Sequence, residues 1–316
     1  MICCIGDLHL GALDRTIPGA YTKVLSTLDR VVENVKKKGC EHIVLLGDIF
    51  DKPTADDDMM IAFWALVMKH KDIKWHSIVG NHDMANVNEY SLKLTKWLGD
   101  VGAFNITTYA KPKVVKINGD KYLFCPHPYV IDAPDSVRYC FGHFGWNGAK
   151  SDTGHSLKTR HEPKGRWVLG DYHTAQRGKR YQYAGGLCQV KFYEGQDKGY
   201  IELDDEDRFV AWEPDIKLGK AVIRNPDDMA ALDKDIYWQV KITAKAGLPA
   251  DWAQRYPHVV DHSADKIASD RAKILMKKVA TEDPLKELPA FLRNCGLSDK
   301  EIALADKILG RQHVSS

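Results

Sequence analysis

The chain has 316 residues and a mass of 35.6 kDa, enough for one large domain with a smaller module or for two domains. With 44% hydrophobic and 28% charged residues, the composition excludes a disordered or collagen-like chain. The longest apolar run, residues 61–68, is far too short for a helix that spans a bilayer, and the first residues lack the features of a signal peptide. We therefore expect a cytoplasmic protein without a membrane partner.

The seven cysteines are scattered without a C-x-x-C pair, and most of them fall in apolar, strand-like runs. Reduced thiols in a protein core show this distribution. We therefore expect neither a disulfide framework nor a cysteine-based zinc site.

The formal net charge of +2 says nothing by itself about a polyanionic partner, but its distribution says more. Residues 150–191 contain nine Lys and Arg against three acidic residues, a local excess of six positive charges. Such a stretch can follow a phosphate backbone, or it can be a solvated loop face, and charge alone favours neither. Arg177, Lys179 and Arg180 are its candidates for contact with a polyanion.

Over the first two hundred residues, short apolar runs that indicate buried strands alternate with amphipathic stretches that indicate helices. This alternation is typical of a layered α/β domain. The expected strands cover residues 2–5, 42–46, 73–79, 114–117, 121–125, 137–141 and 166–169. Helices are expected between them, one with Val24, Leu28, Val31 and Val35 on a single face, one near 56–68 and one near 89–98.

A change of character near residue 215 predicts a domain boundary, with units 1–214 and 215–316. Residues 181–212 are strand-like and rich in turns, and we expect them to form a second sheet that completes the first unit. In the second unit we expect a strand at 237–242, a helix near 249–255, a strand near 258–260 and mostly helical sequence to the end.

Five of the expected strands end in Gly followed closely by Asp, Asn or His. The motifs are G-D-x-H at 6–9, G-D-x-x-D at 47–51, G-N-H-D at 80–83, G-H at 142–143 and G-D-x-H at 170–173. Taken singly, an Asp after a strand is more often a helix cap or a turn former than a ligand. Five in order point to a site, because the carboxyl ends of strands in an open α/β sheet converge on one crevice.

The motifs collect three carboxylates, one amide oxygen and three imidazoles: Asp7, Asp48, Asp171, Asn81, His9, His143 and His173. These groups offer enough oxygen and nitrogen ligands for two divalent ions, with one carboxylate to bridge them. The set contains no thiolate, so it favours Mn, Mg, Fe or Zn over copper or an iron–sulfur cluster. The sequence therefore predicts a dinuclear metal site.

The order and wording of these motifs resemble those of the calcineurin-like metallophosphoesterases. Two further segments, Cys125-Pro126-His127-Pro128-Tyr129 and Gly142-His143-Phe144 followed by Gly148-Ala149-Lys150-Ser151-Asp152, resemble the SbcD family of DNA-repair exonucleases. The resemblance covers about residues 1–212, and the short spacing between Pro126 and His143 would suit a phage-encoded recombination nuclease. It implies an α/β fold: a two-sheet αββα sandwich with a smaller C-terminal α+β capping and helical module.

The resemblance also implies a role for each ligand. Asp7, His9 and His173 would hold one metal, Asn81, His143 and Asp171 would hold the other, and Asp48 would bridge them. Mn is the expected ion, with Mg as the alternative. His82 would be the acid that protonates the leaving alkoxide, oriented by Asp83. For Asp51, support of the ligands, helix capping and direct ligation all remain open.

Other motifs stay open between a functional and a structural role. His127 either lines the substrate groove or packs within its loop, and Phe144, Trp146 and Tyr172 either stack on an unpaired base or wall the pocket. Two amphipathic helices between residues 283 and 302 resemble the element with which the family docks on its coiled-coil ATPase partner. They could equally form a hairpin packed on their own domain.

The leading hypothesis is a metal-dependent DNA nuclease that degrades duplex ends, with single-strand endonuclease activity as a second mode, and acts with an SbcC-like ATPase in DNA repair or recombination. Arg177, Lys179 and Arg180 would contact the DNA, and we expect a homodimer. One alternative is a phosphatase or small-molecule phosphodiesterase of the same fold, since the ligands do not choose the substrate. Another is a non-catalytic recombination scaffold, because Asp171 stands where the family usually has His.

Overall fold

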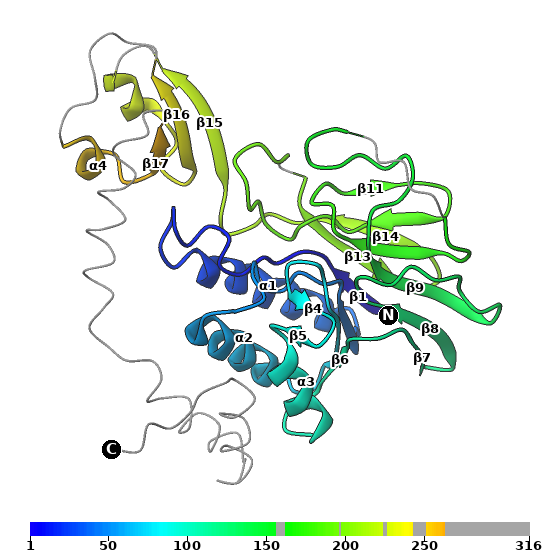
Figure 1. Cartoon of the computed structure of the whole chain (residues 1–316). Coiled ribbons are helices and arrows are strands. Elements are labelled where there is room, and N and C mark those ends of the chain that lie inside the picture. The colour runs from blue at the N-terminus through cyan, green and yellow to red at the C-terminus, as the bar shows by residue number, and fades with distance from the viewer. Residues whose placement is uncertain (156–161, 196, 224–225, 243–250, 263–316) are drawn as a thin grey trace, which may run out of the picture.

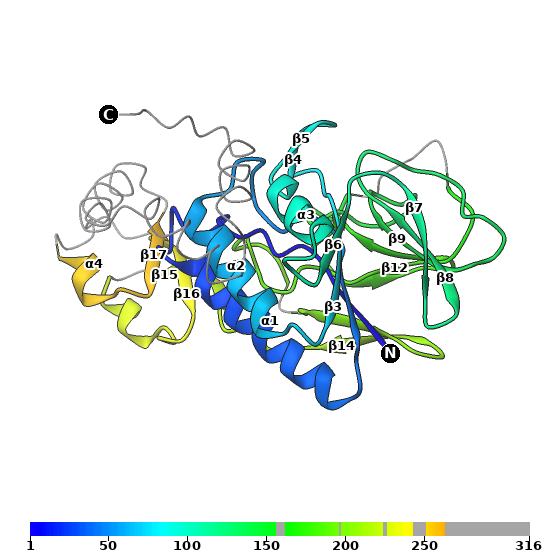
Figure 2. The ribbon, with the colours of Figure 1, turned by 90° about the horizontal axis from the view of Figure 1, so that it is seen from below.

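The computed structural model describes residues 1–155, 162–195, 197–223, 226–242 and 251–262. Two six-stranded sheets pack face to face, and three helices cover the outer face of the first sheet. Figure 2 shows these layers edge-on, with α1 and α2 on one side, β3 and β6 in the middle, and β8, β9 and β12 on the other side. The sandwich of two sheets that the sequence predicts is confirmed.

The first sheet has the strand order β14-β13-β1-β2-β3-β6. Its strands, in that order, are Asp207–Ala211, Gly199–Leu203, Ile2–Ile5, His42–Leu45, Lys74–Ile78 and Ile106–Tyr109. Strands β1, β2, β3 and β6 are parallel, β13 runs antiparallel to β1, and β14 runs antiparallel to β13 and so in the direction of β1. The carboxyl ends of β1, β2 and β3 therefore lie at one edge of the sheet.

The second sheet has the strand order β11-β12-β10-β9-β8-β7. Its strands, in that order, are Gln176–Arg177, Tyr181–Tyr183, Trp167–Gly170, Val137–His143, Asp120–Cys125 and Lys113–Ile117. The predicted hairpin is confirmed, since β7 and β8 are antiparallel and joined by Asn118 and Gly119, which both have positive φ. Strands β8, β9, β10 and β12 are parallel.

The expectation that residues 181–212 form a second sheet is wrong for most of that segment. Only β12 joins the second sheet, while β13 and β14 return to the first sheet beside β1. The physical reason is burial on both faces of β13. Ile201 packs between the two sheets, and Tyr200 packs toward the helices.

Helices α1 (Ala20–Lys37), α2 (Asp57–Lys69) and α3 (Lys93–Asp100) pack on the first sheet. The predicted stripe of Val24, Leu28, Val31 and Val35 is confirmed, because all four side chains are buried. Residues 84–90, part of which we expected to be helical, form the two-stranded ribbon β4 (Met84–Asn86) and β5 (Glu89–Tyr90). No helix of the described residues is long and apolar enough to cross a membrane.

The outer face of the second sheet differs from the αββα expectation. Among the described residues it is covered by loop side chains rather than by helices, and Trp146, Ala149 and Tyr172 form its small core with Trp167 and Tyr183 of the sheet. These loops follow the strands that end at the predicted site, so the layer that covers the second sheet also walls the site.

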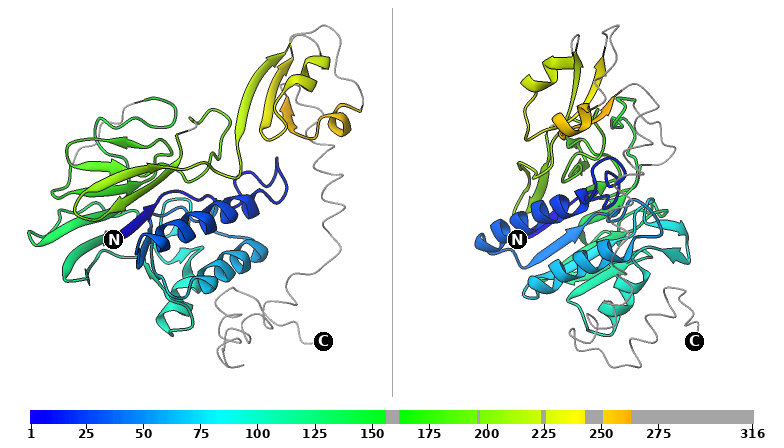
Figure 3. Two further views of the ribbon diagram at one scale, coloured as in Figure 1. Left: turned by 180° about the vertical axis from the view of Figure 1, so that it is seen from behind. Right: turned by 90° about the vertical axis from the view of Figure 1, so that its left-hand side faces the viewer.

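A small C-terminal unit follows the sandwich and projects from it (Figure 3). It has a parallel sheet of β15 (Leu218–Ile223), β16 (Tyr237–Ile242) and β17 (Val259–His262), with the 3-10 helix η1 (Pro226–Ala231) and α4 (Trp252–Arg255). The predicted strand at 237–242 is confirmed. The two helices expected between 283 and 302 lie outside the described residues.

Candidate metal centre

The carboxyl ends of the two sheets meet at one edge of the sandwich, and the seven predicted ligands lie there. Several hydrogen bonds join the sheets at this edge, and two of them involve the predicted ligands of both sheets or the strand end beside them. The amide of Asp171, after β10, donates to Oδ1 of Asp7, after β1, at 3.0 Å. Nδ1 of His143, at the end of β9, donates to the carbonyl of Leu46, after β2, at 2.7 Å. Ligands from distant parts of the chain are therefore brought into one cluster, as the strand-end motifs predict.

The backbone turns sharply where the ligands leave the strands. Asp7, His9, Asp48 and Asp171 have positive φ, at 29°, 44°, 50° and 93°. Residues other than glycine rarely adopt this left-handed region, and such strain collects at functional sites. Gly80 lies against the Asp48 carboxylate so closely that a Cβ atom would overlap it. The glycines of the motifs thus provide space for the neighbouring ligands.

All three imidazoles of the set direct Nε2 into the cluster. Nε2 of His9 and Nε2 of His173 lie 2.9 Å apart, and Nε2 of His143 lies 2.7 Å from Oδ1 of Asn81. The other nitrogen of each ring faces an oxygen atom outside the cluster: the carbonyl of Leu46 for His143, carboxylates at hydrogen-bond distance for His173, and Oδ1 of Asp51 at the longer distance of 3.5 Å for His9. A histidine held in this way presents Nε2 as the ligand atom.

Asp48 lies between the two predicted metal positions. Its Oδ2 atom is 3.5 Å from Nε2 of His9, which belongs to one position, and 3.3 Å from Nε2 of His143, which belongs to the other. Its Oδ1 atom accepts a hydrogen bond from the amide of His82 at 2.8 Å. A carboxylate in this place can share one oxygen between two ions, which is the bridging role expected for Asp48.

Burial and mutual charge shift the pKa values of the cluster. Burial raises the pKa of Asp7 to about 7, against the opposing effect of His143 and His173. Burial also works to raise the pKa of Asp48, but His143 and His9 outweigh it and hold that pKa below its ordinary value. Burial works to lower the pKa of His143, whereas Asp48 and Asp7 outweigh it and raise that pKa. These groups interact strongly because little water separates them.

The donor set fits divalent cations. Oδ2 of Asp7 is buried without a hydrogen-bond partner. The Nε2 atoms of His9 and His173 face each other, so when both rings are neutral at least one of these two nitrogens presents an unprotonated lone pair to the cluster. Three overlapping groups each bring acceptor atoms within 4.8 Å of one another: Asp7, His9 and His173; His9, Asp48 and His82; Asp7, Asp48 and His143. Oxygen and imidazole ligands without thiolate suit Mn, Mg, Fe or Zn.

His82 lies at the rim of the cluster, with 43% of its side chain exposed. Its ring packs edge-on against that of His9, with 4.6 Å between the centroids. Nδ1 of His82 donates to the carbonyl oxygen of Asp51 at 3.0 Å, and Oδ1 of Asp51 lies 3.6 Å from the same nitrogen. Nε2 is thus the nitrogen of His82 that remains to exchange a proton with a substrate.

The expectation that Asp83 orients His82 is wrong, because its hydrogen bonds lead elsewhere. The Asp83 carboxylate is fully buried and accepts from the amides of Phe50 and Gly80, each at 3.1 Å, and from Oγ of Ser91 at 3.0 Å. Burial raises the pKa of Asp83 to about 6, with a further contribution from Asp48. Asp83 therefore ties two ligand loops together, and Asp51 is the residue that holds His82.

Three residues outside the strand-end motifs support His173. Nδ1 of His173 lies 2.9 Å from Oε1 of Glu194 and 3.0 Å from Oδ2 of Asp152. The buried ammonium of Lys198 donates to Oε2 of Glu194 at 2.8 Å and to the carbonyl of His173 at 3.1 Å. Burial works to raise the pKa of Glu194, but His173 and Lys198 outweigh this effect and lower the pKa to about 2. Asp152 was visible in a family segment, whereas Glu194 and Lys198 carried no signal.

The structure does not bring Arg177, Lys179 and Arg180 to the metal centre. Arg180 precedes β12, whose first residue pairs with Trp167 at the start of β10, so it lies at the edge opposite Asp171. Arg180 also pairs with Glu162 at 2.6 Å, and Arg177 contacts Asp207 at 3.4 Å. The local excess of positive charge in the sequence is therefore partly neutralised by the protein itself.

The other open residues mainly wall the site. Trp146 and Tyr172 are buried in the loop core, so they pack within the pocket wall rather than present a free ring. The amide of His127 donates to the carbonyl of Val79 at 2.9 Å and fixes its loop beside the motif of Asn81. Burial lowers the pKa of His127, and His143 adds to this effect.

A sequence model of the calcineurin-like phosphoesterases matches residues 1–186, which is more than half of the chain. The chain belongs to the calcineurin-like phosphoesterase family. The match ends just after β12, so it includes every predicted metal ligand and omits Glu194, Lys198 and the C-terminal unit. No curated protein matches the chain. Family and cluster together indicate metal-dependent hydrolysis of a phosphoester.

Proposed function

We propose that this protein is a metal-dependent DNA nuclease that hydrolyses phosphodiesters at DNA ends, with single-strand endonuclease activity as a second mode. The observation that carries the proposal is the convergence of the Nε2 atoms of His9 and His143 on the oxygens of Asp48 and Asn81, with Nε2 of His173 next to that of His9. The SbcD-like segments around Pro126 and Asp152 support DNA over a small phosphoester, since both lie beside the ligands. The additional C-terminal unit likewise supports a large substrate such as DNA over a small phosphoester.

The residues divide the chemistry between them. Asp7, His9 and His173 would hold one divalent ion, Asn81, His143 and Asp171 the other, with Asp48 shared. Mn is the proposed ion. Two such ions supply Lewis acidity to the phosphodiester and promote ionisation of the attacking water. The carboxylates fix the ligand charge, and the carbonyl of Leu46 and the carboxylate of Glu194 fix which nitrogen of His143 and His173 is the ligand.

His82 would act on the leaving group. Its Nε2 atom is free of the Asp51 contact and lies on an exposed ring next to His9. Proton donation from this nitrogen to the departing 3′- or 5′-oxygen avoids the release of a strongly basic alkoxide. Asp51 would keep the ring in place throughout, because its backbone oxygen accepts from Nδ1 and this hydrogen bond does not involve Nε2.

A partner belongs to the same proposal. Residues from about 280 to 310, which lie outside the described residues, would dock on an SbcC-like ATPase, and the nuclease would act as a homodimer. Deletion of this segment should spare cleavage in Mn and abolish stimulation by the ATPase subunit. Loss of basal cleavage together with folding would assign the segment to the core instead.

The proposal is tested by incubation of the purified protein with end-labelled duplex, single-stranded DNA and a generic phosphomonoester. Each substrate is assayed with Mn, with Mg and with a chelator. We expect DNA to be degraded with Mn and spared with the chelator. Hydrolysis of the phosphomonoester with DNA left intact would favour the phosphatase alternative, and no hydrolysis of any substrate would favour the scaffold.

A further inference from the structure

Tyr193 is held at the surface beside the metal centre by two anchored neighbours. The side chain of Tyr193 is 50% exposed, whereas Phe192 packs against the large core and Glu194 contacts His173 at 2.9 Å. Consecutive Cα atoms lie about 3.8 Å apart. The exposed ring of Tyr193 therefore leaves the backbone one residue before Glu194, which holds the proposed metal ligand His173.

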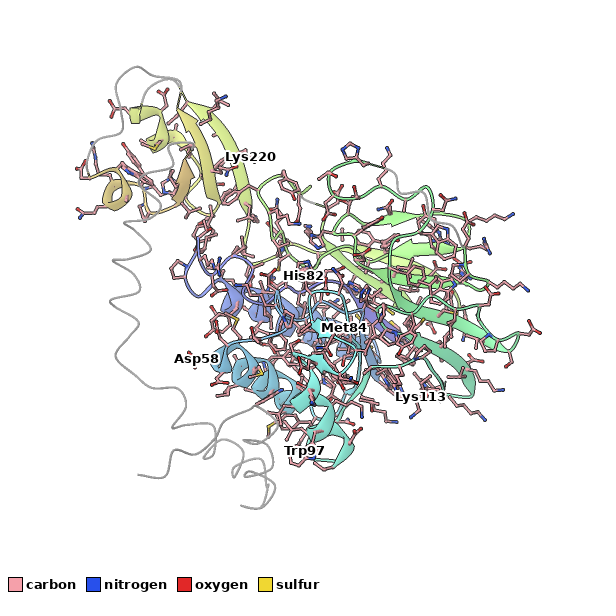
Figure 4. The ribbon with its side chains drawn as sticks, in the orientation of Figure 1. Asp58, His82, Met84, Trp97, Lys113 and Lys220 are labelled. Atoms are coloured by element: carbon pink, nitrogen blue, oxygen red, sulfur yellow. The ribbon has the colours of Figure 1, made fainter. Side chains whose placement is uncertain are left out.

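Two lysines from different segments converge on this ring. Nζ of Lys191 lies 5.8 Å from the centroid of Tyr193, and Nζ of Lys220 lies 5.6 Å from it. Lys220 comes from β15, the strand that leads into the C-terminal unit (Figure 4). In the part of the chain that the structure describes, neither ammonium forms an ion pair with a carboxylate, in contrast to Arg177 and Arg180.

A buried glutamine fixes the two lysine-bearing segments relative to each other. Nε2 of Gln189 donates to the carbonyl of Glu194 at 2.9 Å, and Oε1 of Gln189 accepts from the amide of Leu218 at 2.9 Å. The turn itself closes by a hydrogen bond from the amide of Glu194 to the carbonyl of Lys191 at 3.2 Å. Tyr193 and Lys220 are therefore displayed together by the fold.

We propose that Tyr193, Lys191 and Lys220 form a binding subsite for an unpaired DNA strand next to the metal centre; this inference rests on the proposed function. One base of the strand stacks on the Tyr193 ring, and the two ammonium groups contact the flanking phosphates. An exposed ammonium is held over an aromatic ring more weakly than a base stacks on it. An entering base thus displaces a lysine from the ring and leaves it free to pair with a phosphate.

The occupant is a single strand rather than an intact duplex. Stacking on an aromatic side chain requires an exposed base face, which a paired base inside a duplex does not offer. The free positive charges of Lys191 and Lys220 complement the phosphate backbone on either side of such a base. The subsite would then lead an unpaired end toward His173 and the rest of the cluster.

The test measures binding and cleavage separately on the full chain with Mn. Binding is followed by fluorescence anisotropy with a short, labelled phosphorothioate single strand, which resists hydrolysis. Cleavage is followed with normal DNA and with bis-p-nitrophenyl phosphate, a diester too small to reach the subsite. The variants are Tyr193→Leu, Tyr193→Trp and the double variant Lys191→Gln/Lys220→Gln. Lys116→Gln is the matched control, because Lys116 is exposed and pairs with Lys121 at the other edge of the second sheet.

We expect Tyr193→Leu to weaken strand binding about tenfold, as loss of one stacked base does, and Tyr193→Trp to retain it. The double lysine variant should lower the slope of log Kd against log salt by about 1.4, or about 0.7 for each phosphate contact. All variants should hydrolyse bis-p-nitrophenyl phosphate at the wild-type rate, and Lys116→Gln should behave as wild type throughout.

Unchanged strand binding in Tyr193→Leu, or an equal loss in Lys116→Gln, would overturn the subsite. An absence of strand binding by the wild-type protein would overturn it as well. A wild-type protein that binds the strand but leaves normal DNA intact would instead refute the proposed nuclease function, and the variants would still decide the subsite by their binding.

Discussion

Glu194 holds Nδ1 of His173 at 2.9 Å, although the two residues are 21 positions apart and only His173 belongs to a strand-end motif. Because Nδ1 is the donor in this contact, Nε2 of His173 faces His9 across 2.9 Å. Lys198 binds the second oxygen of Glu194 at 2.8 Å and keeps the carboxylate ionised and fixed. The orientation of one proposed metal ligand thus depends on a buried ion pair outside the family match.

Replacement of Glu194 should weaken metal binding. Glu194→Gln should lower the affinity for Mn by about 10- to 100-fold, since a carboxylate behind a ligating histidine fixes its tautomer and raises its basicity. The affinity is measured by competition with a chelating dye. The variant also leaves Lys198 buried without its partner, so its stability should fall as well, by about 3–5 kcal/mol for a broken buried ion pair.

The double variant Glu194→Gln/Lys198→Met separates the two effects. It removes the unpaired ammonium, so the free energy of unfolding should recover in large part while the weak metal affinity persists. Recovery of the metal affinity together with stability would show that Glu194 serves only the fold.

Replacement of His82 should affect the chemical step according to the leaving group. His82→Asn should reduce cleavage of DNA by about 10² or more, the scale of general acid catalysis, with metal content and DNA affinity unchanged. The rate of hydrolysis of bis-p-nitrophenyl phosphate should fall far less, because p-nitrophenolate leaves without a proton. An equal loss on both substrates would contradict proton donation by His82, and loss of bound metal would assign His82 to the ligands.

Asp171 stands where the resemblance to the family leads us to expect a histidine, and charge predicts the effect of this difference. Two divalent ions carry +4, and Asp7, Asp48 and Asp171 contribute −3, which leaves +1 where a histidine would leave +2. Burial raises the pKa of Asp171, although its side chain is 27% exposed. The additional anion should favour Mn or Mg over Zn and weaken the attraction for a phosphodiester.

Two variants test this account of Asp171. Asp171→Ala should lower the occupancy of one metal and the cleavage rate together. Asp171→His should retain cleavage and move the pH-rate profile toward acid, because the more positive site favours ionisation of water at lower pH. If Asp171→Ala binds two ions and cuts DNA normally, Asp171 is only a turn residue.

His76 predicts how stability depends on pH away from the site. Its Nε2 atom contacts Nδ1 of His42 and its Nδ1 atom contacts the hydroxyl of Tyr109, each at 3.1 Å, in a buried chain across β2, β3 and β6. Burial lowers the pKa of His76 to about 3, against about 6.5 in an unfolded chain. Between these values the unfolded chain binds the proton and the folded protein does not, so stability should fall as pH falls from 6.5 to 3.

His76→Gln should reduce that loss by up to about 1.4 kcal/mol per pH unit, measured by urea unfolding at several pH values. His155→Gln, a change in an exposed histidine, is the matched control and should leave the slope unchanged. A wild-type slope in His76→Gln would show that other groups cause the acid sensitivity.

The sequence predicts the ligands because their positions depend on local features. A strand that ends in Gly-Asp or Gly-Asn-His needs only its own residues to place those side chains, and parallel strands bring their ends to one edge. The same holds for α1, whose buried stripe follows from its spacing. The resemblance to a known family then supplied the division of the ligands between two ions.

The remaining features depend on contacts between distant segments, which the sequence does not reveal. Glu194 lies in a turn without a motif, and only the folded chain brings it to His173. Asp83 follows His82 directly, yet its carboxylate turns to the amides of Phe50 and Gly80. The positive charge of Arg177 in the sequence similarly indicated contact with a polyanion, whereas in the folded chain Asp207 lies beside Arg177.

The central claim is that two ions on this cluster hydrolyse DNA, and a single titration tests it most directly. Mn is added to chelator-treated protein while bound ions per chain and cleavage of end-labelled DNA are measured in the same samples. We predict two ions per chain, cleavage that rises with occupancy of the pair, and both fewer ions and no cleavage in Asp48→Asn. Full cleavage in the presence of chelator, or two bound ions with DNA left intact, would contradict the claim.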